Sequence, residues 1–192
     1  MERIIDSELR GLETMIARMC GLAHEAISTA LHESLYYGDK AVEIILKFQP
    51  VASDLRMVKT FMRISYDLAR LGRYALDIAY VNKRFNGVKS CDEWIREYVK
   101  DMSQKVMSMV ELSLASIRNK SLKGVREASD LEREVDELYK SFLDKIAKDT
   151  SESRAIVSSV LIVRYLERVA DHVVYAYEAL IYMLTGRREL IE

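Results

Sequence analysis

Residues 161–184 read LIVRYLERVADHVVYAYEALIYML, and this segment indicates the class of fold. Its apolar side chains recur at spacings of three and four, the period of an amphipathic α-helix. The predicted apolar face consists of Leu161, Ile162, Tyr165, Leu166, Val169, Val173, Ala176, Tyr177, Leu180 and Leu184. We therefore expect a long helix from Glu152 to about Leu184, with Asp149, Thr150 and Ser151 as candidate caps.

The rest of the chain has the same helical character. Its 192 residues include one proline and seven glycines and are 49% hydrophobic, a composition that suits long helices with a buried core. The Ser90-Cys91-Asp92-Glu93 segment has the form of a capping box, which predicts the start of a helix that ends near Asn119. Apolar periodicity predicts the other helical segments at Asp6–Tyr37, Asp39–Phe48, Val51–Arg84 and Lys123–Lys148. The chain is thus expected to be all-α.

Charge and hydropathy exclude several classes of protein. Lys and Arg number 29 and Asp and Glu 30, so the net charge of -1 predicts no nucleic-acid binding. No window of about 20 residues is free of several charges, so no membrane insertion is expected. No signal peptide is evident, and we predict a cytoplasmic protein. Cys20 and Cys91 lack the spacing of a zinc or disulfide motif and are expected to be packing residues.

A weak internal repeat divides the chain near its middle. The segments Tyr66–Arg73 and Arg164–Asp171 align at an offset of 98 residues, which pairs Leu68 with Leu166 and Arg70 with Arg168. Each segment lies in the third long helix of its half. We therefore predict two related helical repeats, over residues 1–88 and 89–192.

Several motifs in this order resemble the PhoU family. The first is Gln49-Pro50-Val51-Ala52-Ser53-Asp54-Leu55-Arg56 followed by Asp67-Leu68-Ala69-Arg70-Leu71-Gly72. The others are Leu131–Tyr139 and Leu166-Glu167-Arg168-Val169-Ala170-Asp171-His172, with a later Thr185-Gly186. The resemblance covers nearly the whole chain and implies tandem three-helix bundles with a pseudo-two-fold repeat. It also implies regulation of phosphate uptake, with a phosphate transporter or phosphate-sensing signalling proteins as partners, and metal binding by Glu/Asp-x-x-x-Asp motifs.

Two departures from the family pattern concern the first repeat. Ala69 and Arg73 occupy the positions of its expected acid pair, so a metal site there is in doubt. The second helix of the first bundle is shortened to Asp39–Phe48, which spans on the order of 15 Å against about 45 Å for its neighbours. We expect apolar surface to remain uncovered there, and hence a homo-oligomer.

An acidic stripe on the last helix is the candidate metal site. Glu167, Asp171 and Glu178 lie within about 40° of one another around the helix, opposite the apolar face. Carboxylate oxygens suit hard and borderline cations, so a divalent or iron-type metal ion is the expected cofactor. Asp136 and Glu132 on the preceding helix are the preferred additional ligands. The same spacing also fits a solvated face on which Arg164 and Arg168 pair with these acids.

The sequence offers no residues for catalysis. It has no Gly-rich phosphate loop, no nucleophile elbow, no H-E-x-x-H and no Glu-x-x-His, so a metal hydrolase or oxidase is disfavoured. His24 and His32 are expected at the surface, whereas His172 is expected to pack or to form a hydrogen bond. We predict a non-enzymatic adaptor that binds metal or docks on partners. The alternative is a purely structural helical interaction module without metal.

Overall fold

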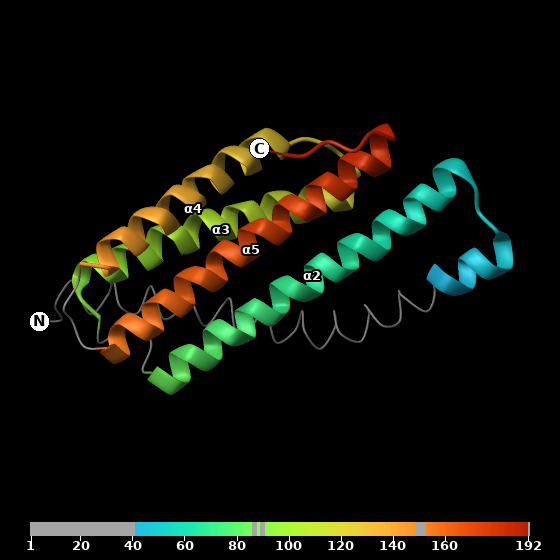
Figure 1. The fold of residues 1–192 in the computed structure, drawn as a ribbon. Helices are drawn as coiled ribbons and strands as arrows, with labels where there is room; N and C mark the ends of the chain where they lie inside the picture. Colours follow the sequence, from blue (N-terminus) through green and yellow to red (C-terminus); the bar gives the residue numbers. More distant parts are fainter. Residues whose placement is uncertain (1–40, 86–87, 89–90, 149–152, 192) are drawn as a thin grey trace, which may run out of the picture.

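A computed structural model describes residues 41–85, 88, 91–148 and 153–191. Residues 41–48 are helical, and four long helices follow: α2 (Ala52–Phe85), α3 (Glu93–Asn119), α4 (Val125–Ile146) and α5 (Ser153–Thr185) (Figure 1). These described residues include no strand, in agreement with the predicted all-α fold. The predicted boundaries of the four long helices are correct to within two residues. The predictions for Asp6–Tyr37, Cys20, His24, His32 and the caps at 149–151 lie outside the described residues.

The predicted capping box at the start of α3 is wrong in its capping residue. The N-cap is Asp92, and its side chain forms no cap hydrogen bond. Its backbone carbonyl instead accepts hydrogen bonds from the N–H groups of Ile95 and Arg96. Cys91 is buried, with 3% of its surface exposed, so core packing fixes the chain just before the helix begins.

α5 occupies the centre of the described helices. It packs against α2, α3 and α4, while α3 and α4 also pack against each other. α2 lies along the opposite side of α5 from α4 (Figure 1). α2 has 34 residues and α5 has 33, so each is about 50 Å long and the two can stay in contact over many turns.

The core between α3, α4 and α5 follows from simple spacings. On α4, Ala128, Val135 and Phe142 recur every seven residues and are at most 1% exposed. The helix therefore presents one narrow apolar seam, and most of its charged residues lie outside that seam. On α3 the buried side chains include Ile95, Val99, Met102, Val106 and Met109. Tyr177 and Leu180 of α5 are fully buried in the same cluster.

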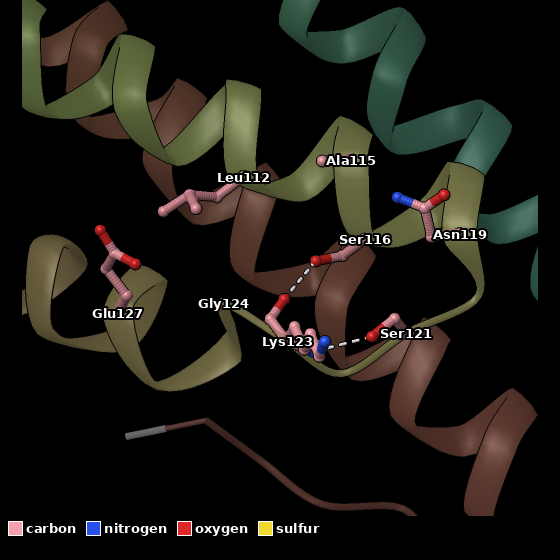
Figure 2. A pocket seen from close by; sticks show the side chains of 8 residues that line it. All are labelled: Leu112, Ala115, Ser116, Asn119, Ser121, Lys123, Gly124 and Glu127. Carbon is pink, nitrogen blue, oxygen red and sulfur yellow. Dashed lines mark hydrogen bonds between the residues drawn. The ribbon is translucent and has the colours of Figure 1, made fainter.

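A tight turn joins α3 to α4 and is held against α5. Ser116 Oγ donates a hydrogen bond of 2.5 Å to the carbonyl oxygen of Lys123 and lies 3.2 Å from the hydroxyl oxygen of Tyr177. Gly124 has a φ of 89°, and a Cβ atom there would lie 3.3 Å from the same hydroxyl. Figure 2 shows this turn as one wall of a cavity of about 490 Å³ that α3 also lines. Glycine at 124 is thus required by its backbone conformation and by the close approach of Tyr177.

A buried polar pair links α2 to α5. Asp67 is completely buried, and its Oδ1 lies 2.8 Å from Nδ1 of His172, which is 6% exposed. Asp67 Oδ2 accepts a second hydrogen bond of 2.9 Å from Nε of Arg63. The prediction that His172 packs or forms a hydrogen bond is confirmed. A buried carboxylate has lost its hydration and needs partners inside the protein, so this interaction fixes how α2 and α5 align.

We expect Asp67→Ala to lower the free energy of unfolding by about 3 kcal/mol, because it leaves a buried imidazole and an arginine without their shared acceptor. Urea denaturation followed by circular dichroism measures this change. Asp144→Ala is the matched control, since Asp144 is exposed on α4, and it should shift stability by less than about 0.5 kcal/mol. Equal effects of the two substitutions would show that the buried pair does not hold the helices.

Candidate functional site

Four of the predicted ligands lie on the neighbouring helices α4 and α5, two on each. Glu132 and Asp136 come from α4, one turn apart, and Glu167 and Asp171 come from α5, also one turn apart. Burial raises the pKa of Glu132, and the charges of Asp136 and Asp171 raise it further. Burial likewise raises the pKa of Glu167, and the charge of Asp171 raises it further. The charges of the four acids therefore act on one another across the two helices, and we call these residues the carboxylate cluster.

Glu167 is much less exposed than its place opposite the apolar face predicts. Only 8% of its surface is accessible, so the alternative of a solvated face does not hold at this residue. The reason is that α5 is covered on several sides, and α4 lies over the side that carries Glu167. Its Oε1 accepts a hydrogen bond of 2.6 Å from Arg164, whereas its Oε2 is buried without a partner.

The raised pKa values have a defined consequence for stability. The folded state holds protons on Glu132 and Glu167 more tightly than the unfolded chain does. Their contribution to stability is therefore fully present below the ordinary pKa of glutamate and is lost as the pH rises through the raised values. At neutral pH, ionised Glu167 in this partly dry place is unfavourable. A bound cation or the neighbouring arginines can offset this cost.

Two arginines pair with the carboxylates that a metal ion would bind. Arg168 Nη1 lies 2.8 Å from Oδ2 of Asp171, and Arg164 pairs with Glu167 in the same way. Among the described residues, no three His, Cys, Asp or Glu side chains converge closely enough to hold a metal ion. The donor set and the unpartnered Glu167 Oε2 fit a hard cation. In this structure, however, Glu167 and Asp171 are paired with arginines.

Glu178 lies apart from the carboxylate cluster. Its Oε1 accepts a hydrogen bond of 3.3 Å from the backbone N–H of Ile191, which ties the C-terminal tail to α5. It also lines a pocket of about 310 Å³ between α2 and α5. The structure thus places four of the five predicted metal ligands on α4 and α5, where their charges act on one another, and places the fifth at a different site.

In the first half of the chain, the positions that match Glu167 and Asp171 carry no paired acids. Ala69 is half-buried on α2 and Arg73 is exposed. Asp77 is half-buried on the same helix, where its charge helps to raise the pKa of the Tyr165 phenol, after burial. A single carboxylate would hold a divalent ion only weakly.

Sequence reasoning missed the pairing of Asp67 with Arg63 and His172. The signal was present, since Asp67 falls between Ile64 and Leu71 on the apolar stripe of α2, and a charged residue on such a stripe is buried only when it is paired. The partner was not predictable, because His172 is 105 residues away in the sequence.

Cys91 has the packing role that the sequence predicted. Its side chain is buried, and its Sγ donates a hydrogen bond of 3.5 Å to the carbonyl oxygen of Ala155. Burial raises the pKa of the thiol, so the reactive thiolate is disfavoured.

Of the helices that the structure describes, none has the length and the apolar character that a membrane span requires.

Comparison with known proteins agrees with the fold and the motifs. The PhoU domain model matches residues 22–81 and 99–180. The phosphate-specific transport system accessory protein PhoU homolog of Clostridium acetobutylicum is 30% identical, over 97% of this chain and 96% of its own length. A homolog from Thermotoga maritima is 24% identical over 95% of this chain and 80% of its own length.

Solved structures share the same architecture. The crystal structure of PhoU from Pseudomonas aeruginosa matches with a TM-score of 0.70 and 20% identity, covering 95% of this chain and 99% of its own. The phosphate transport system regulatory protein PhoU from Streptococcus pneumoniae matches with a TM-score of 0.68 and 22% identity, covering 96% and 98%. The ordered motifs, the helical fold and the similarity along nearly the whole sequence agree, and the chain belongs to the PhoU family.

Proposed function

We propose that this chain regulates phosphate uptake as a cytoplasmic adaptor that docks on a phosphate transporter or on phosphate-sensing signalling proteins. The carrying observation is the similarity to the accessory protein of Clostridium acetobutylicum over nearly the full length of both chains. The adaptor works without catalysis, by shifting the populations of its bound and free states. Two features of the described residues favour binding over chemistry. Burial disfavours the reactive thiolate of Cys91, and Arg164 and Arg168 pair with two acids of the carboxylate cluster.

The second half of the chain is the part that would load a metal ion. Glu132, Asp136, Glu167 and Asp171 would hold it, and the cation would offset charges that now depend on arginines. Metal binding requires the Arg164–Glu167 and Arg168–Asp171 ion pairs to break, so the metal ion replaces the two arginines as the partner of these carboxylates. The first half lacks this capacity, because Ala69 has no donor and the fixed charge of Arg73 repels a cation. The alternative remains a helical interaction module without metal.

Self-association would cover the apolar surface around the short helix at residues 41–48. Leu46 is 73% exposed, Phe48 67% and Val51 74%. Leu55 and Met62 continue this surface along α2 at 41% and 38%. Several large apolar side chains in one region are typical of an interface, whereas scattered ones are not. We therefore include a homo-oligomer in the proposed function.

Co-purification tests the adaptor role directly. The untagged protein, captured by antibody from its native cells grown in low and in high phosphate, is expected to bring down a component of a phosphate transporter or a phosphate-sensing protein. The amount should differ between the two conditions, because a regulator must couple its docking to phosphate supply. Recovery of neither kind of partner in either condition, with the protein itself well captured, would overturn the proposal.

Metal loading is expected to depend on Glu167 and Asp171. Calorimetric titration with manganese, iron(II) and zinc, without phosphate in the buffer, should show binding to the parent and none to the Glu167→Gln, Asp171→Asn double variant. Amide replacements keep the side-chain volume, which matters because Glu167 is buried.

Glu178→Gln is the control for metal loading, since Glu178 lies outside the carboxylate cluster, and it should bind like the parent. Equal binding by the double variant would refute the assigned ligands. No binding by the parent would favour the module without metal.

We expect the parent to be larger than a monomer in light scattering at micromolar concentration. The Leu46→Lys, Val51→Lys double variant should shift it to the monomer, because two charges would be buried in the contact. The matched control is Val157→Lys, at a residue 45% exposed on α5, and it should leave the mass unchanged. A parent that is strictly monomeric contradicts this prediction.

A further inference from the structure

Arg63 is held in place from three sides where α2 meets α5. Its Nε donates a hydrogen bond of 2.9 Å to Asp67 Oδ2. Its guanidinium carbon lies 5.5 Å from the ring centre of Tyr175 and 5.8 Å from that of Tyr66. Asp67 is itself wholly buried and bound to His172, so it cannot follow Arg63 toward solvent. An arginine this restrained has already lost much of the side-chain entropy that binding would otherwise cost.

The restraint leaves most of the guanidinium unused. Only Nε is engaged among the described residues, and 52% of the side chain is exposed. The two terminal nitrogens therefore remain available as donors in a planar fork. Arg63 lines the pocket of about 310 Å³ between α2 and α5, and Lys59 and Arg188 line it too. Helix packing alone explains the Nε bond and the ring contacts, but it does not explain two further cations around one pocket.

The lining of the pocket restricts the class of ligand. Glu178 and Glu189 are also present, so the positive excess is small and would attract a polyanion only weakly. A single planar anion fits the guanidinium fork better. Ala179 and Leu190 add apolar surface, and the volume exceeds what one carboxylate fills. Burial raises the pKa of the Tyr175 phenol, so its hydroxyl stays protonated and able to donate at neutral pH.

Going beyond the proposed function, we infer that this pocket binds one carboxylate group attached to a small apolar body, with the Arg63 guanidinium as its main partner and Lys59 and Arg188 beside it. Such a group occurs on a short organic acid and at the C-terminus of a peptide. The two sources share the chemistry, and they differ in what lies beyond the carboxylate.

Nuclear magnetic resonance titration of the full chain tests this inference with four probes: hexanoate, an N-acetylated Gly-Gly-Leu peptide with a free C-terminus, inorganic phosphate and sodium chloride at matched ionic strength. Hexanoate or the peptide should give saturable shifts at residues lining the pocket, with dissociation constants of about 1 to 10 mM. The tighter of these two probes identifies the source of the carboxylate. Phosphate and chloride should bind more weakly.

Two sets of variants separate binding from stability. The Lys59→Gln, Arg188→Gln double variant removes two exposed cations and should weaken carboxylate binding about tenfold. The Arg63→Gln variant should weaken it by a similar factor, once circular dichroism has shown that this variant is folded. Arg84→Gln with Arg126→Gln removes the same charge elsewhere on exposed positions and should leave binding unchanged. The inference is overturned by absence of saturable shifts for both carboxylates, by tighter binding of phosphate, or by equal binding in all variants.

Discussion

α5 is enclosed by its neighbours, and the rest of the described structure depends on this enclosure. Adjacent residues on a helix are about 100° apart, so a helix that packs on one side buries few adjacent pairs. On α5 the pairs Val173–Val174, Ala176–Tyr177 and Leu180–Ile181 are buried at both positions. The helix therefore needs cover from several directions, which α2, α3 and α4 provide. Single substitutions on α5 disturb more than one helix contact for the same reason.

Enclosure also brings polar side chains of α5 into places with little water, and each of these is matched by a partner from another element or a nearby turn. His172 meets Asp67 of α2 at 2.8 Å, and Tyr177 meets Ser116 of α3 at 3.2 Å. Glu167 is matched by Arg164 through one oxygen only. A buried oxygen without a partner is costly, so this residue is the least satisfied polar group on the helix. That incomplete match is the reason why we propose the carboxylate cluster, and not the other buried pairs, as the place for a cation.

The sequence predicted the helices well because their causes are local. Period, breakers and composition act over a few residues, and they placed α2, α4 and α5 to within two residues. The same reasoning identified two acids on α4 and two on α5 whose charges act on one another, since one-turn spacing puts each pair on one face. It failed where the cause is a contact distant in the sequence. The depth of Glu167 depends on α4, and the partner of Asp67 lies on another helix. Glu178 shares a helix face with Glu167, but it lies about three turns further along α5, beside the tail and the pocket next to α2.

The carboxylate cluster and the α2–α5 contact are joined through Arg168. This side chain donates a hydrogen bond of 2.8 Å to Asp171, which raises the pKa of Arg168, and Tyr74 of α2 acts on that pKa in the same direction. A cation at Asp171 competes with Arg168 for the same carboxylate oxygens, because both need its negative charge. Release of Arg168 would change its interaction with Tyr74, whose ring packs 6.1 Å from that of Tyr165 and 5.7 Å from that of His172. The buried Asp67–His172 pair is next in this series of contacts. These contacts form a continuous series from the carboxylate cluster to α2, the helix that also carries exposed apolar residues.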